Sequence, residues 1–164
     1  MAAITTNKLV KTNQCISTPD GVVLNYWVAA STAIYKGSLV ALNAAGNLVS
    51  YIPATVGTTA VGNHRLIGIA QSAVASQSAA NLVMCPVLVR GRITIAIGST
   101  TIADIGKPVF ASTNNPADIT KTAAGNAYCG YIAAFGATGG DDCVIEFDPQ
   151  KHSGGMPMTL WSTP

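Results

Sequence analysis

The sequence predicts an all-β protein, in the form of a small β-barrel or sandwich of the β-tulip or jelly-roll kind. Segments in which apolar residues alternate with polar ones recur along the chain, and Gly, Asn and Pro turn signals separate them. Patterns typical of helices are nearly absent. Alternation with a period of two indicates strands that bury one face. A length of 164 residues favours a single domain.

The clearest strand is "VRGRITIAIG" at residues 89–98. Side chains in a strand point to opposite faces in turn, so this segment has a face to bury and a face to expose. The face predicted to be buried carries Val89, Gly91, Ile93, Ile95 and Ile97, and the other carries Arg90, Arg92, Thr94 and Ala96.

The remaining strands follow from the same grammar. We expect a strand at 22–30, a hairpin at 37–52 with Gly46 at positive φ, and a short strand at 65–71. The strand around 89–98 extends over 85–97, with Pro86 near its start, where a missing amide is tolerated. Two hairpins follow at 107–123 and 127–148, and the serine-rich stretch 70–84 favours a loop with at most one helical turn. In the last strand Cys143, Ile145 and Phe147 are expected to point inward.

Two stretches share one pattern of a glycine, a strand, a small-residue turn and a second strand. They are "IYKGSLVALNAAGNLVSY" at 34–51 and "IGKPVFASTNNPADITKT" at 105–122. A duplicated hairpin would explain the similarity, and so would the order of strand and turn signals that any two hairpins have in common.

The two ends differ from the middle, so we divide the chain into an N-terminal arm (1–18), a β-domain (19–149) and a C-terminal tail (150–164). The tail places four large apolar side chains beyond a Ser-Gly-Gly stretch. Such side chains are costly to leave in water. We expect the tail to dock on its own domain or on a neighbouring subunit through Met156, Met158, Leu160 and Trp161.

The composition argues against several partners. Charged residues are 10% of the chain and hydrophobic residues 49%, with a formal net charge of +2 and a single glutamate, Glu146. A charge this small, without a run of Lys and Arg, does not predict nucleic-acid binding. No apolar run is long enough to span a membrane, and no signal core is present at the N-terminus, so we expect synthesis in a cytoplasm. Depletion of charge is typical of surfaces that meet other protein.

No constellation of residues indicates catalysis, a cofactor or a metal. His64 and His152 have no spaced partners, and the acidic pair at 141–142 is explained by a turn. Asp104 is expected to cap a turn. Four widely spaced cysteines favour buried thiols, with a disulfide or a zinc site as the alternatives; they are Cys15, Cys85, Cys129 and Cys143. We therefore expect no enzyme, no cofactor and no metal site.

Arg90 and Arg92 are the most informative charges, because spacing i and i+2 places both guanidinium groups on one sheet face. One interpretation is a solvated face with a cross-strand carboxylate such as Glu146. The other is an inter-subunit or partner contact, in which Arg pairs with carboxylates.

The order of these pieces resembles the capsid decoration (cement) proteins of tailed bacteriophages over residues 34–148. The segments that carry the resemblance are "YKGSLVAL", "LIGIAQ", "VLVRGRITIAI", "DIGKPVFAS", "DITKT", "YCGYIAAF" and "DCVIEFD". The resemblance implies a β-domain on the outer surface of the virion that assembles as a homotrimer. It also implies that the protein bridges neighbouring major capsid proteins and stabilises the head.

A receptor- or glycan-binding β-module, of the head-fibre or spike type, is the alternative function. Tyr26 and Trp27 adjoin in "NYW", and exposed aromatic side chains are typical of sugar-binding faces.

Overall fold

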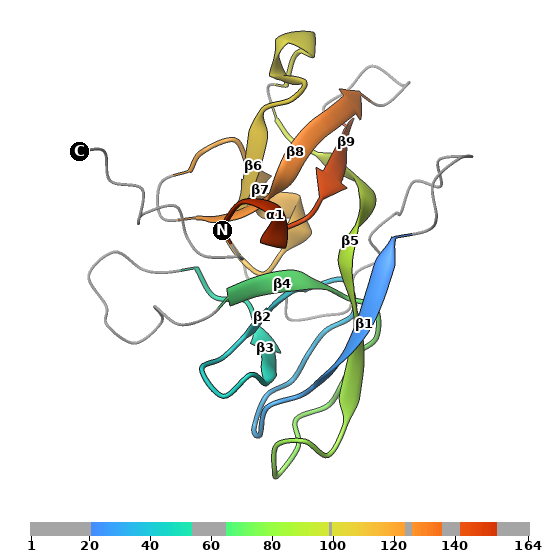
Figure 1. Cartoon of the computed structure of the whole chain (residues 1–164), viewed down its shortest axis with the longest axis vertical. Coiled ribbons are helices and arrows are strands. Elements are labelled where there is room, and N and C mark those ends of the chain that lie inside the picture. The colour runs from blue at the N-terminus through green and yellow to red at the C-terminus, as the bar shows by residue number, and fades with distance from the viewer. Residues whose placement is uncertain (1–20, 54–64, 99, 124–125, 136–141, 154–164) are drawn as a thin grey trace, which may run out of the picture.

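The computed structural model describes residues 21–53, 65–98, 100–123, 126–135 and 142–153. The described chain is all-β, as predicted, and forms one curled antiparallel sheet of half-barrel shape (Figure 1). The predicted arm lies outside the described residues, and so does the predicted tail beyond residue 153.

The strands match the predicted segments closely. They are β1 (Val22–Trp27), β2 (Leu39–Leu42), β3 (Leu48–Ser50), β4 (Arg65–Ala70), β5 (Met84–Ala96), β6 (Pro108–Ala111), β7 (Ile119–Thr120), β8 (Ala127–Phe135) and β9 (Asp142–Phe147). Short 3-10 turns η1 (Ile102–Asp104) and η2 (Pro116–Asp118) flank β6, and α1 (Gln150–Ser153) follows β9. The segment between β4 and β5 is a loop, and Gly46 has a φ of 80°.

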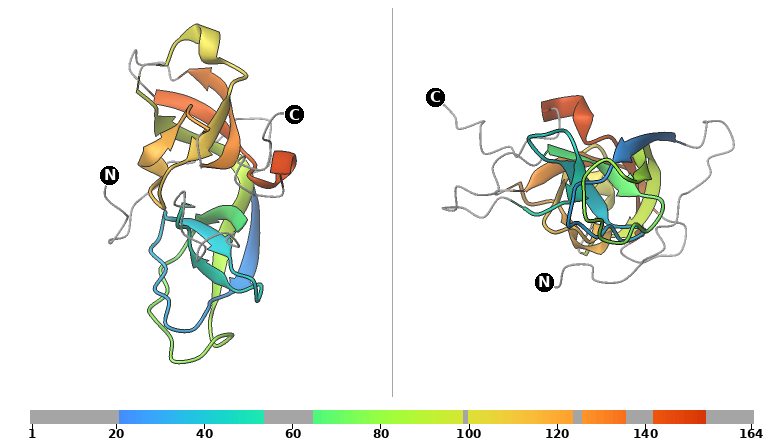
Figure 2. Two further views of the ribbon diagram at one scale, coloured as in Figure 1. Left: turned by 90° about the vertical axis from the view of Figure 1, so that its left-hand side faces the viewer. Right: turned by 90° about the horizontal axis from the view of Figure 1, so that it is seen from below.

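The long strand β5 is shared by the two halves of this curled sheet, which we call the first sheet and the second sheet. Its first half pairs with β4 and β1, and its second half pairs with β9. The first sheet therefore runs β3-β2-β4-β5-β1, and the second runs β7-β6-β8-β9-β5. The views in Figure 2 show the two sheets stacked along the long axis of the molecule.

The two sheets have the same connectivity. Each contains a hairpin and the two strands that follow it in the chain, and a strand that precedes the hairpin in the chain pairs with the last of these strands. In the first sheet that preceding strand is β1, and in the second it is the end of β5. We name residues 22–90 repeat 1 and residues 91–148 repeat 2. This common topology extends the similarity of the two hairpins to five strands.

Irregularities in the two repeats coincide as well. Val40 pairs with Gly68 in repeat 1 and Val109 pairs with Gly130 in repeat 2, and a register shift follows each pair. Just before each hairpin, a glycine with positive φ donates its amide hydrogen to a backbone carbonyl of the strand that follows the hairpin. That strand is β4 in repeat 1 and β8 in repeat 2. These bonds, Gly37 to Ala70 and Gly106 to Ile132, are both 2.8 Å long. Register shifts and glycine hydrogen bonds at matching positions favour a duplication over features common to all hairpins.

The core has two parts, which lie on the two faces of the first sheet. One part contains side chains from both sheets, including Leu66, Leu88, Ile93 and Ile145. The other contains Val40, Ile67 and Val87 together with residues of the loops that cover them. The inward direction predicted for the last strand is confirmed, since Cys143, Ile145 and Phe147 are fully buried.

Candidate interaction surfaces

The outer face of the second sheet carries the arginine pair. The predicted alternation of β5 is confirmed, because Ile93 and Ile95 are buried whereas Arg90 is exposed and Arg92 is half-buried. Glu146 on β9 lies directly opposite Arg92. The side chain of Arg90 forms an ion pair with Asp148, with 3.6 Å between Nε and Oδ2.

Tyr131 and Lys151 complete this face. Tyr131 on β8 lies opposite Glu146, and their side chains are hydrogen-bonded, which raises the pKa of the tyrosine. The Lys151 ammonium lies 5.3 Å from the centre of the Tyr131 ring. The arginines therefore face carboxylates of their own chain, as the cross-strand interpretation predicts. An ion pair as exposed as that of Arg90 contributes about 0–1 kcal/mol to stability.

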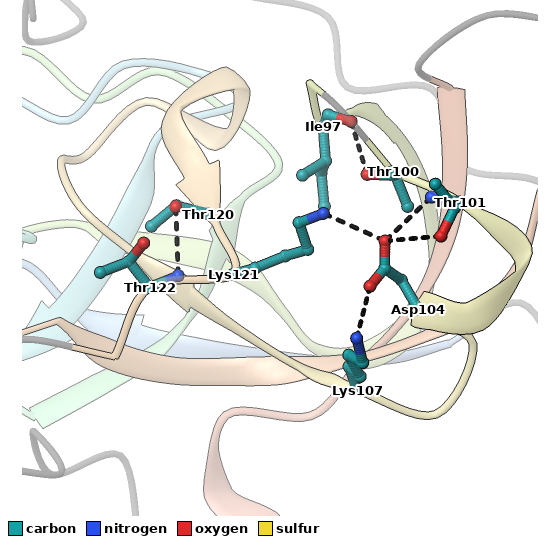
Figure 3. Close-up of polar contacts among 8 residues, drawn as sticks. All are labelled: Ile97, Thr100, Thr101, Asp104, Lys107, Thr120, Lys121 and Thr122. Carbon is teal, nitrogen blue, oxygen red and sulfur yellow. Dashed lines mark hydrogen bonds and ion pairs between the residues drawn. The ribbon is translucent and has the colours of Figure 1, made fainter.

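A second polar cluster organises the segment before β6 (Figure 3). The Asp104 carboxylate is buried, and it accepts hydrogen bonds from the backbone and hydroxyl of Thr101 at 2.9 and 3.4 Å. It also forms ion pairs with Lys107 at 2.8 Å and with Lys121 at 3.0 Å. The expectation that Asp104 caps a turn is confirmed, and the two lysines add a link from this turn to the residue after β7.

The charges around Asp104 favour its ionised form. The hydrogen bond from Lys107 is the largest of several causes that hold the pKa of Asp104 well below its usual range, with further contributions from Thr101 and Lys121. A carboxylate that stays ionised and is held by four donors is a poor general base. Its role here is to fix the turn.

The turn that Asp104 fixes presents two large apolar side chains to solvent. Ile102 is 79% exposed and Ile105 is 47% exposed. We call these two residues the η1 tip. The turn projects at one end of the molecule's longest axis, where it is the yellow coil at the top of Figure 1. No sequence pattern singled these isoleucines out, because a short turn has no periodicity to read.

Most of the other exposed apolar side chains gather around β1. Of the nine large hydrophobic residues that are exposed in the described chain, six lie on β1, at the first residue of β5 or in the loop just before it. We call this set the β1 patch; it consists of Val22, Val23, Leu24, Trp27, Leu82 and Met84. Trp27 and Met84 are register partners and therefore share one face of the strand pair, whereas alternation places Val22 and Leu24 on the opposite face of β1.

Several residues considered in the sequence lie outside this description. Met156, Met158, Leu160 and Trp161 are outside the described residues, as are His64 and Cys15. Within the described ranges, no three His, Cys, Asp or Glu residues are grouped so that they could hold a metal ion.

Three of the four cysteines are thiols buried in the core, namely Cys85, Cys129 and Cys143. Burial raises the pKa of Cys85 and of Cys129. A thiol kept protonated and covered reacts slowly, so Cys85 and Cys129 act as small hydrophobic groups.

Comparisons with family models, with curated proteins and with solved structures each found no match to this chain. No helix in the described part of the chain has the length and apolar character needed to cross a membrane.

Proposed function

We propose that this chain is a structural virion protein that decorates the outside of an icosahedral phage head and stabilises it by bridging major capsid proteins. The resemblance of residues 34–148 to decoration proteins supplies the class. The observation that supports bridging is the placement of exposed apolar side chains in two separate regions, the η1 tip and the β1 patch.

The two regions suit a protein that contacts more than one neighbour. The η1 tip lies at one end of the long axis, and Leu82 belongs to the loop that forms the other end (Figure 1). Each contact is small, but several weak contacts made together to a repeating shell hold strongly. A rigid tip loses little conformational entropy on binding, and the ion pairs of Asp104 supply that rigidity.

The test is co-sedimentation of the purified protein with empty heads of the source phage that lack it. We expect saturable binding, and we expect decorated heads to resist heating better than bare heads. Ile102→Lys should weaken binding at least tenfold, because it charges the η1 tip. Ala44→Lys adds the same charge to the exposed turn between β2 and β3, and serves as the control. Absence of head binding by the unaltered protein would contradict the proposal.

A glycan-binding module is the second candidate, and the exposure of Trp27 favours it. Asn25 lies two residues away on the same face of β1 and is also exposed, so an aromatic platform and an amide are adjacent. Specific binding on a glycan array that is lost in Trp27→Ala would support this function. An array without hits, together with binding to heads, would exclude it.

A further inference from the structure

β1 is the edge strand of the first sheet, and it exposes apolar side chains on both faces. Val22 and Leu24 are 46% and 47% exposed on one face, and Val23 and Trp27 are 47% and 44% exposed on the other. In the described part of the chain, β1 pairs along its length with β5. Its other side is met just past its end, where Val28 forms a bridge with Leu48 and Ala29 donates its amide to the Leu48 carbonyl at 3.0 Å. The open part of this edge is therefore the segment before Val28.

The equivalent strand of repeat 2 shows how unusual this edge is. In repeat 2, the end of β5 occupies the position that β1 has in repeat 1, and β9 occupies the position of the first half of β5. With this correspondence, Ile93 is equivalent to Leu24, and Arg92 is equivalent to Val23. Ile93 is fully buried, whereas Leu24 is exposed. Arg92 puts a charge on the edge of the second sheet, which is a common protection against pairing with other chains. β1 lacks any charge, proline or glycine.

The hydrogen-bonding groups on the open side of β1 follow from the register. Gln71 donates its amide to the Pro86 carbonyl at 2.8 Å, so Pro86 directs its backbone toward the end of β4. Asn25 lies opposite Pro86. Opposed residues in an antiparallel pair alternate between bonded and non-bonded, so Asn25 and Pro86 are a non-bonded pair. Asn25 therefore directs its N–H and C=O toward the open edge, and Val23, two residues earlier, does the same.

These groups are self-complementary. If two β1 strands lie antiparallel with Leu24 opposite its own copy, Val23 of each molecule faces Asn25 of the other. Both pairs are then bonded pairs, which exchange four N–H···O hydrogen bonds in total. The side chain of Val22 then lies beside Tyr26 of the second molecule, and the two Leu24 side chains meet at the axis.

We propose that β1 pairs with β1 of a second copy of this chain across a two-fold axis at Leu24, which joins the first sheets of the two molecules. A two-fold contact requires a surface that matches itself, and the register above provides one. No Asp, Glu, Lys or Arg occurs at residues 21–35 or 71–89, and Arg90, which lies opposite Val22, is paired with Asp148. Little repulsion between like charges therefore opposes the approach of the two copies.

This contact goes beyond the proposed function, and it is additional to the three-fold assembly that the resemblance implies. The solution mass separates the cases. A dimer, or a hexamer in which both contacts form, supports the β1 pairing. A monomer or a trimer overturns it, and that is also the result if part of the same chain covers β1. Head binding is measured independently, so either proposal can fail alone.

Sedimentation equilibrium of the full chain and two variants tests the contact. Leu24→Lys places two charges at the axis, and we expect it to raise the dissociation constant of the two-fold contact at least tenfold. Ile102→Lys adds the same charge at the more exposed η1 tip, and we expect no change in mass. Melting temperatures check that both variants fold. A Leu24→Lys variant that folds and keeps the mass of the unaltered protein overturns the proposal.

Cross-linking tests the register. Non-bonded residues opposite each other have Cα atoms about 4.5 Å apart, within the range of a disulfide. In a Cys15→Ser background, Leu24→Cys should form a covalent dimer when copper phenanthroline oxidises the two thiols. Val22→Cys is equally exposed on the same face but faces Tyr26 of the second copy, so it should not cross-link. Equal or greater cross-linking at Val22 overturns this pairing.

Discussion

The side chain of Tyr51 joins the two sheets, and its removal offers a quantitative test of the packing. Tyr51 follows β3 of the first sheet and is 2% exposed. Its hydroxyl accepts a hydrogen bond from the Ala127 amide at 3.2 Å and donates one to the Ala111 carbonyl at 3.4 Å. Both partners belong to the second sheet, on β8 and β6. A phenylalanine would keep the ring in place and leave both backbone groups without the hydroxyl.

The expected cost follows from those two bonds. A buried amide left without a partner costs about 1–3 kcal/mol, and the longer bond to Ala111 adds less. We therefore expect Tyr51→Phe to lower the free energy of unfolding by about 2 kcal/mol. In a protein of this size that lowers the melting temperature by about 4–8 °C.

Urea denaturation followed by far-UV circular dichroism measures this change. Tyr131→Phe is the matched control, because it removes a hydroxyl that bonds Glu146 at the surface; it should change stability by less than about 0.5 kcal/mol. Equal effects of the two substitutions, or no loss in Tyr51→Phe, would refute the role of the buried hydroxyl.

The same residue gives a pH dependence. Burial is the largest cause that raises the pKa of Tyr51 to about 12 from its ordinary value of 10. Because the folded pKa is the higher one, the contribution to stability is complete below pH 10 and is lost as the pH rises toward 12. In Tyr51→Phe this part of the alkaline loss of stability should be absent.

Three further predictions concern other parts of the molecule. Asp104→Asn should lower the melting temperature at pH 7, and the difference from the unaltered protein should shrink as the pH falls below about 4. The reason is that the depressed pKa of Asp104 stabilises the fold only where the carboxyl group is ionised in the unfolded chain. A difference that does not depend on pH would contradict this. Gly68→Ala should cost about 1–3 kcal/mol in urea denaturation, since its Cβ would collide with a carbonyl oxygen of β5, whereas Gly98→Ala meets nothing within 4 Å and should change stability far less. Replacing Arg90 and Arg92 together by alanine should weaken head binding or self-association more than it lowers the melting temperature; a large thermal loss with unchanged binding would restrict the pair to the cross-strand role.

Much of the arginine face could be predicted from the sequence. A period of two placed Arg90 and Arg92 on one face, and Glu146 was named as an example of a cross-strand carboxylate for them. The register of β5 and β9 confirmed that Glu146 faces Arg92. The ion pair of Arg90 with Asp148 could not be predicted, because it depends on where the end of β9 lies beside β5, and no local sequence pattern gives that position.

The exposed apolar surfaces could be predicted less well. The strand predicted at 22–30 is present as Val22–Trp27, but the sequence does not say whether a strand lies in the middle of a sheet or at its edge. The isoleucines of the η1 tip look like core residues in the sequence. Their exposure depends on the turn that Asp104 and its two lysines hold away from the sheet.

The sequence by itself determined the all-β class, the positions of the strands along the chain and the direction of the side chains along them, because alternation and turn chemistry act between neighbouring residues. Tertiary structure alone decided that β5 serves two sheets, that Lys121 reaches Asp104 across 17 positions, and that Tyr51 joins strands 60 and 76 positions away. Such contacts depend on how the chain returns on itself. The same dependence left the apolar strand β1 at an edge, where it can meet another molecule.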